Sequence, residues 1–277
     1  MPIRHLPDPE FISRDVHKIT AELTAKYELL AGKTLYPAQA DRVFVDVIAY
    51  REMLLRTAIN EAGKQNLVAF ATGVMLDYLG DFFGVVRLDG ETDEQLRTRI
   101  RLAPESYSTT GSRRAYIYHA LTADDRVIDA EAINVDNRVQ VYILTDDAFE
   151  NDVSDELIDK VQQAVNDDKR RPLSDHVTTY KAVAHSYALD IDLLVYAPAD
   201  ALIVKQTVLE QLQALTQNLR SKLGQSVIPS QIIQIIRHEA IQQIIINQPT
   251  GLVAVKPYEY AVCTGITLNT REVRRDF

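Results

Sequence analysis

Apolar residues recur every three or four positions through the amino-terminal part of the chain, which is the spacing of one helix face. They begin at Phe11 and continue to Leu30, and Gly32 follows as a typical helix end, so a helix is predicted between Pro9 and Gly32. A second helix is predicted after Pro37. Its apolar stripe is broad enough to be buried on more than one side and contains Phe44, Val47, Ile48, Leu54, Leu55 and Ile59.

A third helix is predicted to begin near Asn66, which would be its N-cap. Its apolar residues are Leu67, Phe70, Val74, Leu76 and Leu79. Residues 60–66 would form a short turn, so the second and third helices would be antiparallel neighbours.

A capping box predicts a fourth helix. Thr92 and Gln95 have the Thr-x-x-Gln spacing in which each side chain accepts the other residue's backbone N–H. This helix carries Arg97, Arg99 and Arg101 and is expected to end before Pro104, because proline has no N–H to donate. Residues 104–112 would then form a loop, and the region before it would be helical.

Beyond residue 112 helical spacing mixes with strict alternation of apolar and polar residues. The pattern predicts a helix around 113–121, then a strand containing Val139, Val141 and Ile143. A helix capped by Ser154 and an extended segment at about 176–185 follow. This order favours helices on one face of an antiparallel sheet.

The carboxy-terminal part repeats the theme. Alternation from Leu189 to Val195 predicts a strand, and a long helix follows Asp200 and ends before Gly224. The predicted inner side of that helix is Ile203, Leu209, Leu212, Leu215 and Leu219. A short helix from Pro229 and strands at 241–246 and 258–263 complete the unit. We therefore predict an α+β fold, with a helical amino-terminal region at 1–111 and two small α+β sandwich modules at 112–185 and 186–277.

Composition narrows the classes of function. The chain has 30 Lys and Arg against 39 Asp and Glu, a net charge of −9, so no general attraction to nucleic acid or anionic lipid is expected. Its single cysteine, Cys263, cannot form an internal disulfide and is predicted to be a small buried residue of a strand. No glycine-rich phosphate loop is present, so no nucleotide cofactor is expected. No signal peptide or membrane span is recognised either.

The candidate catalytic groups are weak. The six histidines have no metal-ligand spacing. The acidic stretch from Asp146 to Asp159 could hold a divalent metal, but it lacks the glycine and ligand order of a calcium loop. Asp190 and Asp192 would share one strand face. Arginines between Arg97 and Arg114 could hold an anion or serve as ion-pair partners. A metal-dependent enzyme is therefore kept as the lesser alternative.

Residues 227–246 contain more apolar surface than one helix face and one strand face need. The segment is rich in isoleucine: Ile228, Ile232, Ile233, Ile235, Ile236, Ile241, Ile244, Ile245 and Ile246. Exposed apolar surface of this extent promotes aggregation. It must therefore be covered by the chain itself or by a partner.

The segment DVIAYREMLLRTAINEAGKQNLVAFATGVMLDYLGDFFGVVR, residues 46–87, resembles the helical signature of the baseplate J-like family of contractile phage tails. The AxGxxLDxLG run at 71–80, Arg87 after the Gly-Val pair, and the LAPE and TGSRRAY elements within 102–116 stand in the family's order. The resemblance covers most of residues 37–145, and the length is that of the short form found in P2-like phages.

The resemblance implies a non-enzymatic subunit of a baseplate wedge, made and assembled in the bacterial host cytoplasm and located in the virion tail baseplate. Its partners would be other copies of the chain, a smaller wedge protein, and hub and sheath-proximal proteins, with no nucleic acid, membrane or cofactor. The helices at 41–59 and 66–79 would contact other wedge subunits. The candidate interface residues are Phe44, Val47, Leu55, Phe70, Leu79, Ile232 and Ile236. A related contractile injection particle, such as a tailocin, is an alternative setting.

Overall fold

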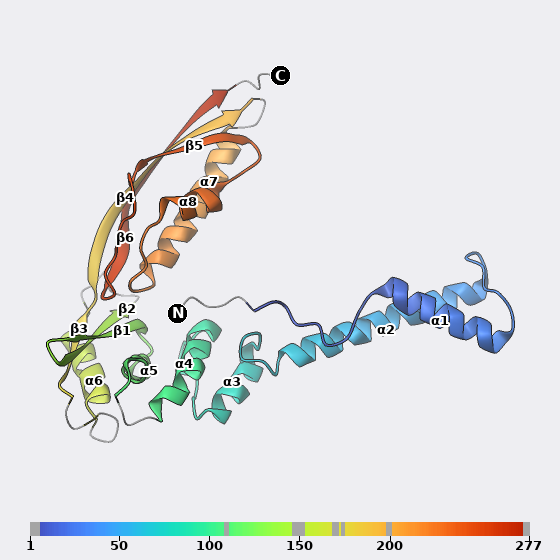
Figure 1. Ribbon diagram of the computed structural model, residues 1–277, viewed down its shortest axis with the longest axis horizontal. Helices are drawn as coiled ribbons and strands as arrows, with labels where there is room; N and C mark the ends of the chain where they lie inside the picture. Colours follow the sequence, from blue (N-terminus) through green and yellow to red (C-terminus); the bar gives the residue numbers. More distant parts are fainter. Residues whose placement is uncertain are drawn as a thin grey trace. The chain divides into compact units, whose positions relative to one another are not determined.

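The computed structural model describes residues 6–107, 111–145, 153–167, 172, 175–197 and 201–273. The chain divides into two compact units (Figure 1). The helical unit comprises Met1–Arg87 and Thr92–Ile100, and the α+β unit comprises Leu88–Glu91 and Arg101–Phe277. The amino-terminal part is helical and the rest is α+β, as predicted. The domain boundaries after residues 111 and 185 stay predictions.

The helical unit begins with a hairpin of two helices, α1 (Val16–Ala31) and α2 (Ala40–Lys64) (Figure 1). Asp15 caps α1, because its Oδ1 accepts the backbone N–H groups of His17 and Lys18. Gly32 ends α1 with a φ of 61°, a left-handed conformation that favours glycine. The predicted end of this helix is confirmed.

The contacts of Asn60 explain why the end of the second helix and the start of the first helix differ from the prediction. The predicted turn at 60–66 is wrong, because α2 continues to Lys64. The Asn60 amide tolerates this position because its Oδ1 accepts the N–H groups of Phe11 and Ile12 at 2.9 and 3.0 Å, and its Nδ2 donates to Ile12 O at 2.8 Å. The same bonds keep residues 11 and 12 outside α1. The hairpin partner of α2 is therefore α1 and not the third helix.

The third helix, α3 (Gly73–Phe82), begins later than predicted, because residues 66–71 form a series of tight turns. The capping box of α4 (Asp93–Ser106) is confirmed: Thr92 N donates to Gln95 Oε1 at 2.9 Å and Gln95 N to Thr92 Oγ1 at 3.4 Å. The predicted end before Pro104 is wrong. The last turn survives the missing proline N–H and closes at Ser106, whose hydroxyl donates to Ala103 O at 2.6 Å.

The AxGxxLDxLG run joins α3 to α4. Gly73 has a φ of 53°, and its N–H donates to Asp93 Oδ2 at 2.9 Å. Arg87 bridges two carboxylates, Asp77 and Asp93, at 2.7 Å each. The pKa of Asp93 is lowered by the Gly73 N–H and by Arg87. A Cβ on Gly80 would lie 2.6 Å from Val85 O, so only glycine permits the close return of the chain there. The run is therefore a structural motif.

The first module of the α+β unit consists of α5 (Arg113–Ala123), β1 (Val127–Val135), β2 (Arg138–Thr145), α6 (Asp155–Val165) and β3 (Val177–Lys181). Ser112 and Ser154 cap the two helices, the second as predicted. Asp136 and Asn137 form the β1–β2 turn with φ of 51° and 63°. The sheet order is β1-β2-β3, with β1 antiparallel and β3 parallel to β2. The sheet is mixed, not antiparallel as predicted, because α6 returns the chain between β2 and β3.

The second module consists of β4 (Val183–Tyr196), α7 (Ala201–Arg220), α8 (Pro229–Ile236), β5 (Ile241–Gln248) and β6 (Glu259–Val273). Its sheet has the order β5-β4-β6 and is also mixed, since β6 runs parallel to β4. The residues of β4 alternate between the core and the other face, as predicted. On α7 the predicted inward position of Ile203 is wrong, since Ile203 is exposed; Val204 and Val208 are buried there with Leu212 and Leu219.

Candidate protein interface

The helix α2 carries apolar side chains on three sides, and only one of them packs against the described part of its own unit. Val45 and Ala49 are buried toward α1, where Ile19 is the buried residue. Arg56 closes the same side by donating to Ser13 O at 2.9 Å.

Two further rows of α2 face solvent. The first α2 stripe is Phe44, Ile48, Leu55 and Ile59, whose side chains are 54% to 69% exposed. The second α2 stripe is Val43, Val47, Tyr50 and Leu54, which are 38% to 59% exposed. Both rows recur at three-, four- or seven-residue steps, so each lies along one line of the helix. A helix with apolar rows on more than one side is buried by more than one neighbour.

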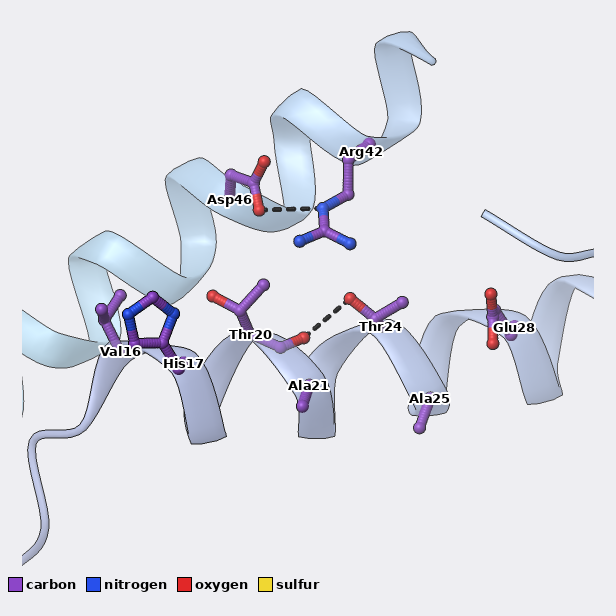
Figure 2. Close-up of a pocket in the computed structure, with 9 residues that line it drawn as sticks. All are labelled: Val16, His17, Thr20, Ala21, Thr24, Ala25, Glu28, Arg42 and Asp46. Atoms are coloured by element: carbon purple, nitrogen blue, oxygen red, sulfur yellow. Dashed lines mark hydrogen bonds and ion pairs between the residues drawn. The ribbon is translucent and has the colours of Figure 1, made fainter. Parts of the chain in front are cut away.

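A groove of about 640 Å³ lies between α1 and α2 (Figure 2). The middle of its lining on α1 consists of the small residues Thr20, Ala21, Thr24 and Ala25, and Val16, His17 and Glu28 line it toward the two ends. On α2 it is bordered by Arg42 and Asp46, whose Nε and Oδ1 are 3.0 Å apart. Small side chains allow the axis of another helix to come close.

The loop end of the hairpin is held by a cluster around Asp41. Tyr27 Oη donates to Asp41 Oδ2 at 2.6 Å, and Lys33 Nζ donates to the same oxygen at 2.7 Å. The hydrogen bond from Lys33, followed by that from Tyr27, lowers the pKa of Asp41, and the pKa of Lys33 is raised in return. These contacts fix α1 and α2 relative to each other, so the groove and both stripes are presented by a defined scaffold.

The predicted interface residues fall into three groups. Phe44, Val47 and Leu55 are exposed on α2. Phe70 and Leu79 are half-buried. The isoleucines of α8, in contrast, belong to the core of the second module, where Ile232 and Ile236 are 1% and 0% exposed.

Burial inside the chain removes Ile232 and Ile236 from the surface available to a partner, which corrects their selection as interface residues. Pro229 lies in the first turn of α8, where the missing N–H costs no hydrogen bond, and one face of the helix packs into the core together with residues of α7 and the sheet. Much of the isoleucine-rich segment is thus covered by this chain, although Ile233, Ile235 and Ile245 remain about 40% exposed.

One exposed apolar row was missed by the sequence reasoning. Val74, Tyr78 and Phe82 on α3 are 65%, 68% and 83% exposed. Val74 was grouped with the other apolar residues of the predicted helix, and Tyr78 and Phe82 were left out. The four-residue spacing of these three residues was the available signal.

Among the described residues, the candidate catalytic groups are not brought together into a site. Asp190 and Asp192 are half-buried on the face of β4 opposite the core, and Asp192 accepts from Asn247 and Asn269 at 3.2 and 2.9 Å. The pKa of Asp192 is lowered, chiefly by Asn269. Within the described residues, no group of three or more His, Cys, Asp or Glu side chains is arranged to hold a metal ion. Residues 146–152 of the acidic stretch lie outside the described residues.

The arginines bond with groups of the chain itself. Arg97 is 5% exposed and donates to Val68 O at 2.8 Å and Ala71 O at 2.6 Å, which ties α4 to the turns before α3. Arg114 pairs with Glu105 at 2.9 Å, and Arg113 pairs with Glu131. Of the two roles open to these arginines, the described contacts match the ion-pair role.

Two smaller predictions can also be compared with the described residues. Cys263 is half-buried in β6, not buried as expected. None of the helices in the described ranges combines the length and apolar character that crossing a bilayer requires.

Comparisons with known proteins identify the class to which this fold belongs. Three family models match in succession and together cover most of the chain. They are the Baseplate J-like N-terminal domain at residues 43–89, the Baseplate J-like central domain at 108–181, and the Baseplate J-like protein C-terminal domain at 187–269. The chain belongs to the Baseplate J-like family.

The chain is also similar to one curated protein and to one chain of a solved structure. It is 25% identical over 287 aligned residues to Baseplate protein J of Escherichia phage P2, covering 95% of each chain. It is also similar to a chain in the cryo-EM structure of the anti-feeding prophage (AFP) baseplate, with 12% identity and a TM-score of 0.44. That match covers 67% of this chain and 42% of the other, so the chain spans less than half the length of the AFP subunit. Family membership supports a structural role in a baseplate over an enzymatic one.

Proposed function

We propose that the chain is a non-enzymatic assembly subunit of a contractile-tail baseplate wedge, in which α2 is the inner helix of a bundle formed with other chains. The observation that carries the proposal is the pair of exposed apolar rows on α2, the first and second α2 stripes. One row would require one neighbouring helix, and two rows on different sides require two.

The size of the exposed surface makes a bundle energetically reasonable. Complete burial of a Val, Leu, Ile or Phe side chain contributes about 1.5 to 3 kcal/mol. The eight side chains of the two stripes are still 38% to 69% exposed, so covering them contributes on the order of 7 to 13 kcal/mol before the entropy of association is subtracted. Exposed apolar rows of this kind mark interaction sites in soluble proteins.

The candidate occupants are helices of other copies of this chain and of a smaller wedge protein. The groove between α1 and α2 offers a further docking line. Phe70 and Leu79 are half-buried, and their exposed atoms are proposed to contact a partner as well. Hub and sheath-proximal proteins are proposed to contact other parts of the chain, and no nucleic acid or membrane is needed.

The proposed mechanism is the formation of several interfaces at once, which are kept or released when the tail contracts. Only contacts that differ in free energy between two assembled states can drive or gate such a change. The proposed location is the tail baseplate of the virion, after synthesis and assembly in the host cytoplasm.

Co-expression with the smaller baseplate protein encoded beside this gene tests the proposal. We expect a complex that contains both chains and that sediments faster than either chain alone. A chain that stays monomeric at micromolar concentration and does not co-elute with that protein would contradict the proposal.

A matched pair of variants localises the interface. Ile48→Asp places a carboxylate in the first α2 stripe, whereas Leu252→Asp changes a side chain of the second module that is 63% exposed. We expect the first variant to lose the complex and the second to retain it. Equal behaviour of the two variants would exclude α2 as the docking element.

A further inference from the structure

We propose that the two modules of the α+β unit move as one rigid body, held together by a lock formed between β1, the β2–β3 pair and the start of β6. The proposal rests on contacts inside the α+β unit alone and is independent of the partners proposed above. Four separate sets of contacts carry it.

The first contact is a carboxylate that links the modules through the backbone. Asp129 of β1 uses Oδ2 to accept the N–H of Leu223 at 2.8 Å, and Oδ1 to accept the N–H of Ala130 at 2.9 Å. Leu223 follows α7 in the second module and also bridges to Tyr260 of β6. A carboxylate that accepts two backbone N–H groups forms charge-assisted bonds in a defined direction.

The second contact is a stack of three tyrosine rings that crosses from one module to the other. Tyr142 of β2 stacks on Tyr180 of β3, with centroids 5.4 Å apart, and on Tyr258 of the second module, with centroids 4.9 Å apart. Lys256 Nζ lies 5.5 Å from the centroid of Tyr258 and extends the stack. Tyr142 therefore has one neighbour in its own module and one in the other.

The third contact is the connection itself. β3 ends at Lys181 and β4 begins at Val183, so a single residue separates the two sheets. The N–H of Ala182 donates to Ile143 O in the first module at 2.9 Å, and the N–H of Val183 donates to Tyr258 O in the second at 3.1 Å. The two consecutive N–H groups of this connection are thus bonded to different modules, which leaves the connection little freedom to act as a hinge.

The fourth contact is a small apolar cluster beneath these bonds. Leu144 of the first module packs with Leu223 and Tyr260 of the second, and all three side chains are at most 9% exposed. Opening the modules would expose this cluster to water and leave the Leu223 N–H without Asp129, so the opening would carry both an apolar and a hydrogen-bonding cost.

Local stability measured in the full chain tests the rigid-body proposal. Hydrogen exchange followed by mass spectrometry in increasing urea reports the unfolding midpoint of peptides from β2 and from β4 separately. Gln162→Ala changes a residue of the first module and removes two hydrogen bonds: Thr179 N donates to Gln162 Oε1 at 2.6 Å, and Gln162 Nε2 donates to Val177 O at 2.8 Å. These bonds reach the backbone of β3 and none of the lock side chains Asp129, Tyr142 and Tyr180, so the substitution directly perturbs only the first module.

In the otherwise unchanged chain we expect Gln162→Ala to shift the midpoints of β2 and β4 peptides by the same amount. When Asp129→Ala and Tyr258→Ala are added, we expect the shift to stay in the first module and the two midpoints to separate. A Gln162→Ala chain in which only the β2 peptides shift would overturn the proposal. This outcome is readable even if the lock variants do not fold.

Discussion

Replacing Leu55 by aspartate is the sharpest perturbation of the proposed bundle. Leu55 lies in the middle of the first α2 stripe and is 59% exposed in the isolated chain. The substitution should leave the free chain folded, because an exposed helix position away from special contacts changes stability by about 0.5 kcal/mol or less. In the proposed bundle, however, the carboxylate of the new aspartate would be buried against apolar side chains of a neighbouring helix.

The magnitude follows from the exposed fraction. Full burial of leucine contributes about 1.5 to 3 kcal/mol, so covering the remaining 59% contributes about 1 to 2 kcal/mol. Placing an unpaired carboxylate in the contact adds a desolvation cost of about 2 kcal/mol or more. The sum of about 3 to 4 kcal/mol corresponds to a loss of affinity of roughly 100- to 1000-fold.

Sedimentation velocity with the co-expressed wedge partner measures this loss, and urea unfolding of the free chain measures whether the fold is intact. Leu252→Asp serves as the control, because its leucine is exposed to a similar degree outside the helical unit. A Leu55→Asp chain that assembles within threefold of the unchanged chain, with normal unfolding of both, would refute the argument that this stripe is buried by a partner.

The remaining predictions concern stability, pH and the enzymatic alternative. Gly80→Ala should lower the free energy of unfolding by about 2 kcal/mol, because its Cβ would meet Val85 O at 2.6 Å; an unchanged urea midpoint would contradict this close approach. Asn60→Ala should cost about 2 kcal/mol and accelerate amide exchange at Phe11 and Ile12, whose N–H groups lose their acceptor; unchanged exchange there would count against the assigned bonds. Burial raises the pKa of Asp129 from 3.8 to about 6, although the Leu223 and Ala130 N–H groups lower it. Of the nearby charges, Glu131 raises this pKa and Lys222 lowers it. A pKa that is raised in the folded state contributes stability that is complete below pH 3.8 and is lost as the pH rises through 6. Lowering the pH from 7 to 5 should therefore raise the free energy of unfolding of the unchanged chain by about 1 kcal/mol more than that of Asp129→Asn. Parallel pH profiles of the two chains would contradict this. The double variant Asp190→Asn, Asp192→Asn should assemble tails normally, since the described bonds of Asp192 are with asparagine amides, whereas a metal-dependent enzyme would lose its activity.

Much of the fold could be predicted because its signals are local. Gly32, Thr92, Gln95, Ser154 and the alternation in β4 each satisfy backbone groups or a sheet face within a few residues, and each acts as expected. The end of α2 was predicted wrongly because it depends on a distant partner. Local sequence alone suggests that Asn60 belongs to a turn. In the structure its side-chain amide bonds to the backbone of Phe11 and Ile12, almost fifty positions away, and Asn60 stays within the helix.

The candidate interface could be predicted only in part for the same reason. Apolar residues along one side of a helix predict that this side is buried, but they do not show whether it packs against the same chain or against a partner. Phe44 and Leu55 are exposed in the isolated chain, whereas Ile232 and Ile236 have the same residue character and fill the chain's own core. The parallel pairing of β3 with β2 could not be predicted either, because it depends on how α6 carries the chain from one strand to the next, and no local pattern gives that path.

Side-chain oxidation footprinting of α2 in free chain and assembled baseplate tests the central claim most directly. Hydroxyl radicals modify Phe44, Tyr50, Leu54 and Leu55 in proportion to their exposure, and the free chain exposes all four by 38% to 69%. We predict strong protection of both α2 stripes on assembly, with unchanged oxidation of Leu252 as the internal reference. Oxidation of the two stripes in the assembled baseplate at the rates of the free chain would contradict the claim that α2 is the inner helix of a bundle.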